Sequence, residues 1–221
     1  MEGSLWTNWW SDSDLVIRAV FITLISLSVG GWSVIVYKIS HYRSVLKREK
    51  QVRQLLMRDE GMCASTLVEL LPLQSISYPF LARYATQQHS EDRGQRKIEL
   101  ETRAAQFLDE RRVDLENGLI VLAIIGNSAP FIGLLGTVWG IMHALQSLGG
   151  SAMLSMDMVA GPVSEALVAT AVGLFAAIPA AAAYNLLVRS LRRISSMTAG
   201  NLREMCDVIL FSEGGSNGRI S

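Results

Sequence analysis

Three long apolar stretches constrain this chain more than any other feature of its sequence. They cover residues 15–37, 118–148 and 161–188. Each is long enough to cross a hydrocarbon core of about 30 Å at about 1.5 Å per helical residue. Half of all residues are hydrophobic and only 18% are charged, and the apolar residues are clustered instead of spaced for an amphipathic surface. We therefore expect an all-α integral membrane protein with three transmembrane helices.

The distribution of lysine and arginine predicts the orientation of these spans. Residues 1–14 contain no Lys or Arg, and the only charge in residues 149–160 is Asp157. Residues 38–117 and 189–221, in contrast, carry basic residues close to the spans. Because basic residues stay on the cytoplasmic side, we expect the N-terminus and the 149–160 loop outside, with the 38–117 domain and the 189–221 tail in the cytoplasm. The acidic N-terminal segment also argues against a cleaved signal peptide.

The long cytoplasmic interval has a helical pattern of its own. Charges of alternating sign run from Glu91 to Glu116 among apolar residues, which predicts one helix feeding straight into the second span. A second helix is expected from His41 to Arg58, with turns near Gly61 and between Pro72 and Pro79. These charges fit a solvated helical surface, so we assign them no chemistry and expect long helical extensions of the membrane helices.

Several classes of function find no support in the sequence. Twenty basic and 20 acidic residues cancel, which gives no indication of a nucleic-acid partner. The three histidines are far apart, and no metal-ligand, phosphate-cradling or nucleophile motif is present, so we expect no metal, no cofactor and no enzyme activity. Both cysteines, Cys63 and Cys206, fall on the cytoplasmic side, where no disulfide is expected.

Small residues follow a helical spacing along the second and third spans. Strips of this kind let helices approach closely in lipid, where packing and interhelical hydrogen bonds drive association. Two such strips on a small protein predict a helix bundle and an oligomer. The residues expected to pack are Gly133, Gly136, Gly140, Ala166, Gly173 and Ala177.

Three polar side chains inside these spans are candidates for a conducting path. Glu165 is costly within a span unless it meets water, a proton or a partner charge. Thr137 and Thr170 fall at similar depths, about 16 Å and about 14 Å from the outer surface, and so form one polar level. Each has an ordinary alternative, because a membrane threonine often bonds a backbone carbonyl and Glu165 could lie in headgroup water. His143 lies near the interface and is left out of the site.

The two span sequences carry a resemblance to a known family. The runs APFIGLLGTVWGIMHAL and AGPVSEALVATAVGLFAAIPAAAAYN resemble the ExbB/TolQ/MotA family of proton-channel subunits, most closely its ExbB and TolQ branches. The resemblance covers the three spans, the topology and the cytoplasmic interval. The run AGPVSEAL is similar to the ExbB form, whereas TolQ proteins usually carry a run like APGIAEAL. Some ExbB proteins share that second form.

The resemblance implies an assembly and assigns roles. It implies a homopentameric ring in a Gram-negative inner membrane, around a pore that holds helices of a single-span, ExbD-like protein with an intramembrane Asp, and a TonB-like protein as third partner. By their place in the matching runs, Thr137 and Thr170 are expected to line the pore and Glu165 to lie on the proton pathway. A TolQ-type role in the Tol-Pal envelope system remains open, as does a non-conducting membrane scaffold whose small residues and threonines only pack helices.

Overall fold

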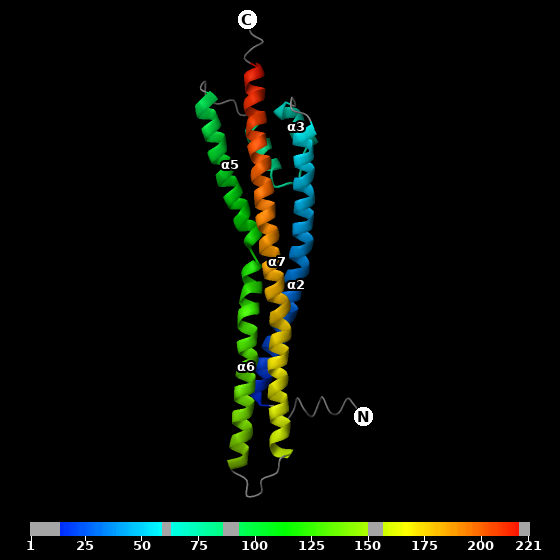
Figure 1. Ribbon diagram of the computed structural model, residues 1–221, viewed down its shortest axis with the longest axis vertical. Coiled ribbons are helices and arrows are strands. Elements are labelled where there is room, and N and C mark those ends of the chain that lie inside the picture. Colours follow the sequence, from blue (N-terminus) through cyan, green and yellow to red (C-terminus); the bar gives the residue numbers. More distant parts are fainter. Residues whose placement is uncertain (1–13, 59–62, 86–92, 150–156, 217–221) are drawn as a thin grey trace. The chain divides into compact units, whose positions relative to one another are not determined.

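A computed structural model of the chain describes residues 14–58, 63–85, 93–149 and 157–216, and every regular element in these ranges is a helix. Three of the helices are long and apolar enough to cross a membrane, which confirms the expected all-α class with three membrane-length helices. The helices are α2 (Leu15–Arg58), α3 (Ala64–Leu70), α4 (Tyr78–Tyr84), α5 (Arg93–Glu116), α6 (Leu119–Gly149) and α7 (Asp157–Ser216) (Figure 1).

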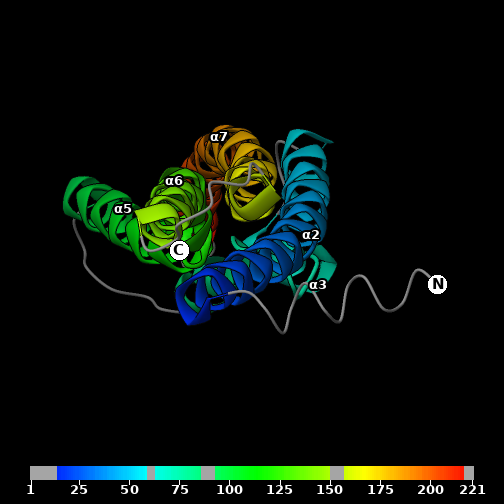
Figure 2. The same ribbon diagram turned by 90° about the horizontal axis from the view of Figure 1, so that it is seen from below.

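The chain divides into two compact units. The first comprises the residues up to Tyr37 together with Gly118–Leu186, and the second comprises Lys38–Asn117 and Leu187–Ser221. In the first unit, α6 and α7 lie side by side in both views (Figures 1 and 2). Its buried core is built mainly from small and aliphatic residues of α2, α6 and α7, among them Leu24, Ile125, Ala129, Ala169 and Ala180.

The outward surface of the first unit is also apolar. Large side chains such as Ile22 on α2, Phe131 on α6 and Phe175 on α7 are exposed. A water-soluble bundle would cover such residues, whereas a lipid-facing one displays them because the acyl chains are equally apolar. The exposed apolar surface of the first unit is therefore the kind expected of helices that face lipid.

The junction between α5 and α6 corrects one expectation. The helix ending at Glu116 does not feed straight into the second span, because the residues Asn117 and Gly118 form a turn. Gly118 has a φ of 84°, in the left-handed region that favours glycine. The helical piece expected from His41 to Arg58 is present as the last part of one continuous helix that begins at Leu15.

The end of α5 is held by two side chains from α2. Leu115 is in the last turn of α5, so its carbonyl has no intrahelical partner. The hydroxyl of Tyr42 donates to that oxygen at 2.6 Å, and the ammonium of Lys38 donates to it at 3.0 Å. Both side chains are buried. A cation at a helix C-terminus also complements the negative end of the helix dipole.

The second unit has its own hydrophobic core. It is formed by residues from α2, α3, α4, α5 and α7, with Phe80, Leu81, Leu100 and Met205 among the most deeply buried. The expected turn near Gly61 lies outside the described residues, and the one between Pro72 and Pro79 connects α3 to α4. The tail expected beyond Val188 continues as α7 to Ser216.

A buried carboxylate ties three parts of the second unit together. Glu49 of α2 is fully buried. Its carboxylate accepts hydrogen bonds from the backbone N–H groups of Ile76 and Ser77, from the Ser77 hydroxyl at 2.7 Å and from the Asn201 amide of α7 at 2.8 Å. Four donors bind the two carboxylate oxygens, which makes the burial of this polar group tolerable.

Candidate functional site

The contact between α6 and α7 is the structural centre of the site, and glycine makes it possible. A Cβ atom added to Gly173 would lie 2.7 Å from the carbonyl oxygen of Ala129, and one added to Gly133 would lie 2.9 Å from that of Ala169. Both distances are shorter than any real Cβ contact. The two backbones therefore meet at a separation that only glycine permits.

The predicted packing residues fall along this contact. A Cβ on Gly136 would lie 2.8 Å from the Ala169 Cβ, and one on Gly140 would lie 2.7 Å from the Ala166 Cβ. Ala177 is buried in the core of the first unit. The strip on α6 thus meets the strip on α7 over several turns. One further contact of the same type, not predicted from the sequence, lies at Gly126, where an added Cβ would be 3.1 Å from the Ala181 Cβ.

The hydroxyls of both threonines donate to backbone carbonyls of the same chain. The Thr137 hydroxyl donates to the Leu134 carbonyl of its own helix at 2.7 Å. The Thr170 hydroxyl donates across the helix contact to the Gly133 carbonyl at 3.0 Å. Each hydroxyl oxygen keeps acceptor capacity after donating its hydrogen. The chain therefore holds both hydroxyl groups in the way the packing alternative describes, and each oxygen can still accept a further hydrogen bond.

Glu165 lies on α7 at the level where that helix meets Gly140. It is partly buried and directly precedes Ala166, the residue that contacts Gly140. On a straight helix, Glu165 and Thr170 point about 140° apart. Glu165 and Thr170 therefore belong to different faces of α7, and Thr170 reaches the glycine contact through its hydrogen bond to Gly133.

A polar contact of the first unit, between α6 and the residue before α2, was not indicated by the sequence. The indole N–H of Trp139 on α6 donates to the Asp14 carboxylate at 2.6 Å. This hydrogen bond is the main reason that the pKa of Asp14 is lowered, and the nearby His143 adds to the effect. An acidic residue immediately before a span was the available signal, but its partner lies 125 residues away. Within the described residues, no group of three His, Cys, Asp or Glu side chains could hold a metal ion.

Comparisons with known proteins place the chain in a family. Residues 73–199 match the model of the MotA/TolQ/ExbB proton channel family, and this range includes Thr137, Glu165 and Thr170. The chain is 37% identical over 193 residues to a biopolymer transport protein ExbB of Neisseria meningitidis, covering 80% of this chain and 84% of that protein.

Two other relatives represent both branches. An ExbB of Xanthomonas campestris is 36% identical over 190 residues, which covers 79% of this chain and 74% of that protein. A Tol-Pal system protein TolQ of Haemophilus influenzae is 33% identical over 190 residues, which covers 79% of this chain and 80% of that protein.

Proposed function

The chain belongs to the MotA/TolQ/ExbB proton channel family, and from this premise we propose that it is an ExbB-type subunit that uses the proton motive force. Membership makes it a multi-pass membrane transport protein and not an enzyme. We propose that it works in a Gram-negative inner membrane with its N-terminus in the periplasm, as a homopentameric ring. Its partners would be an ExbD-like single-span protein and a TonB-like protein, which is energised to drive outer-membrane uptake of iron-siderophores and similar nutrients.

The observation that carries the proposal is the hydroxyl level at the α6–α7 contact. Thr170 is fixed there by its hydrogen bond to Gly133, and Thr137 lies one helical turn further along α6 and is buried. Polar groups this deep in a span are costly unless they serve packing or a polar path. The sequence runs that contain both threonines lie in the region that the family model matches, which favours a polar path over packing alone.

A proton path also needs an acid at mid-depth, which this chain lacks. None of the three spans contains an Asp, and Glu165 lies nearer the outer surface. In the proposed mechanism, protons enter past a ring of Glu165 carboxylates and reach an Asp of the partner helix beside Thr137 and Thr170. Neutralising that Asp removes its desolvation cost and frees the partner helix to move against the ring. One proton crossing the membrane releases about 2.3 kcal/mol per 100 mV.

Glu165→Ala and Thr170→Val test the pathway. Both variants should abolish energised uptake and proton flux while the complex still assembles, and Thr170→Ser should retain activity because it keeps a hydroxyl. Thr23→Val is the matched control, since the exposed Thr23 hydroxyl only bonds the Ala19 carbonyl of its own helix. Normal uptake in both Glu165→Ala and Thr170→Val would refute the pathway and leave the packing role.

A TolQ-type role is the second candidate, supported by the similarity to the TolQ protein of Haemophilus influenzae. The two roles differ in the phenotype of a deletion strain. An ExbB-type protein is needed for growth under iron limitation, whereas a TolQ-type protein is needed for resistance to detergent. A non-conducting scaffold would tolerate Glu165→Ala. Vesicles that contain such a scaffold and any co-purified single-span protein would show no proton flux.

A further inference from the structure

A concave site in the second unit lies outside the proposed proton path. It is formed between α4 and α5 and has a volume of about 460 Å³. That volume is in the range of pockets that bind small ligands or single anchoring side chains. We call it the α4–α5 pocket. All its lining residues belong to the second unit, so it does not depend on the arrangement of the membrane helices.

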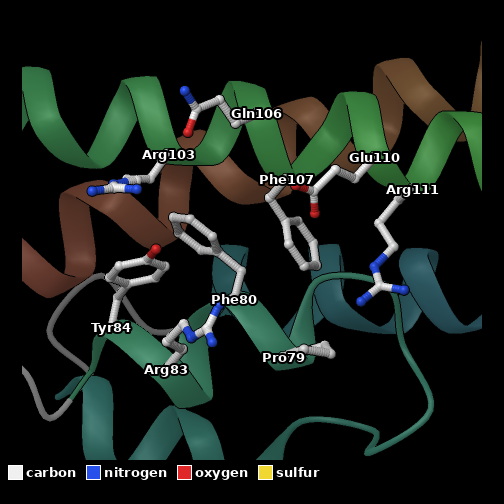
Figure 3. A pocket seen from close by; sticks show the side chains of 9 residues that line it. All are labelled: Pro79, Phe80, Arg83, Tyr84, Arg103, Gln106, Phe107, Glu110 and Arg111. Carbon is white, nitrogen blue, oxygen red and sulfur yellow. The ribbon is translucent and has the colours of Figure 1, made fainter.

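Three aromatic rings form the inner wall of the pocket. Phe80 is buried, and its ring centroid lies 4.8 Å from that of Tyr84 and 5.8 Å from that of Phe107. Figure 3 shows the three rings between α4 and α5. Phe80 packs against both other rings. Tyr84 and Phe107 are only partly buried, so part of each ring is open to a ligand.

Three guanidinium groups surround these rings. Arg103, Phe107 and Arg111 follow each other at intervals of four on α5, so they share one face of the helix. In Figure 3, Arg103 and Arg111 extend from either side of Phe107, and Arg83 reaches the same space from α4. Glu110 is the single carboxylate among the lining side chains. The pocket therefore has an excess of positive charge.

The three arginines differ in the contacts that they already make within the chain. Arg111 lies 5.1 Å from the Phe107 ring centroid and pairs with Asp114 at 3.4 Å. Arg83 and Arg103 are exposed, and neither has a hydrogen bond or ion pair to any residue that the structure describes. Guanidinium groups hold carboxylates through two parallel hydrogen bonds, which gives them both strength and orientation.

We propose that the α4–α5 pocket binds an acidic segment of a partner protein, with one aromatic side chain on the rings and flanking carboxylates on Arg83 and Arg103. Arginine and aromatic residues are the types that dominate binding energy at protein interfaces. The positive excess selects an acidic partner. The rings select an apolar anchor beside its carboxylates. The inference does not rest on the proposed function, because it needs only that the second unit lies in water.

Fluorescence anisotropy on the full chain in a neutral detergent tests the proposal, with the labelled peptide Asp-Glu-Phe-Glu-Asp as the probe. Binding should saturate and should weaken roughly tenfold when the ionic strength rises from about 0.05 M to about 0.3 M. Arg83→Gln and Arg103→Gln should each weaken it roughly fivefold. The neutral peptide Asn-Gln-Phe-Gln-Asn and the anchorless peptide Asp-Glu-Ala-Glu-Asp should bind at least about tenfold more weakly.

Arg93→Gln is the matched control, because Arg93 is an exposed arginine of the same helix that does not line the pocket. It should bind the probe like the wild type, and circular dichroism should show equal helicity in all variants. Equal losses for Arg93→Gln and Arg83→Gln would overturn the proposal, because any surface charge would then suffice. A change of oligomeric mass in Arg83→Glu would also overturn it, because a second copy of this chain would then be the occupant.

Discussion

Gly173→Ala is the sharpest test of the helix contact at the centre of the site. The added Cβ would lie 2.7 Å from the Ala129 carbonyl oxygen and 3.2 Å from the Gly133 Cα, short of the 3.4 Å at which ordinary contact begins. Because the opposing atoms belong to the backbone, no side chain can rotate away. The helices must separate by several tenths of an ångström, which also lengthens the hydrogen bond from Thr170 to Gly133.

The cost of this change follows from three terms, two that destabilise the protein and one that stabilises it. Forcing an extra carbon into a closely packed contact costs about 1–3 kcal/mol. Replacing glycine by alanine within a helix returns up to about 1 kcal/mol, and weakening one interhelical hydrogen bond in a membrane costs about 0.6 kcal/mol. We therefore expect the free energy of unfolding to fall by about 1–2 kcal/mol.

Reversible unfolding in mixed micelles, with SDS as denaturant and circular dichroism as the signal, measures this loss. Gly161→Ala is the matched control on the same helix, because a Cβ there would meet nothing within 4 Å. It should leave the free energy of unfolding unchanged or raise it slightly. If Gly173→Ala unfolded at the same SDS fraction as Gly161→Ala, the close approach of α6 and α7 would be refuted.

Three further predictions concern the second unit. Glu49→Ala should lower its free energy of unfolding by roughly 2–4 kcal/mol, because it leaves buried donors such as the Ser77 hydroxyl without the carboxylate that accepts from them, as thermal unfolding will measure. Tyr42→Phe should cost about 1 kcal/mol in the same measurement, because it removes one of two hydrogen bonds to the last turn of α5. The exposed Cys63 should react with iodoacetamide at lower pH than a free cysteine, because the Ser65 hydroxyl lowers the pKa of its thiol, so the thiolate forms earlier as pH rises. Ser65→Ala should shift the midpoint of that rate profile to higher pH.

Lys50→Ala and Tyr84→Phe are the matched controls for the two stability predictions. Lys50→Ala, next to Glu49 but exposed, should be neutral, and equal losses in both would mean that the buried network adds nothing. Tyr84→Phe should be neutral, because no hydrogen bond to its hydroxyl is present among the described residues. An unchanged rate profile in Ser65→Ala would show that the hydroxyl does not act on the thiol of Cys63.

The membrane helices could be predicted from the sequence because hydropathy and small-residue spacing are local signals. The turn before α6 was missed although Asn117-Gly118 is a turn dipeptide, since the alternating charges run up to Glu116, the apolar span begins directly after it and no proline lies between them. The hydrogen bonds from Trp139 to Asp14 and from Asn201 to Glu49 join residues 125 and 152 positions apart. No periodicity within one helix encodes such pairs, because they depend on how the helices are packed.

The packing of α6 against α7 bears directly on where a proton could travel. A Cβ on Gly133, Gly140 or Gly173 would lie within 3.0 Å of an atom of the opposing helix. A gap that excludes a single carbon atom also excludes water, so no file of water fits between these two helices at that level. In the proposed mechanism, a path past Thr137 and Thr170 therefore runs along the outside of this helix pair. The proposed ring and partner helix would supply the walls that the pair itself does not.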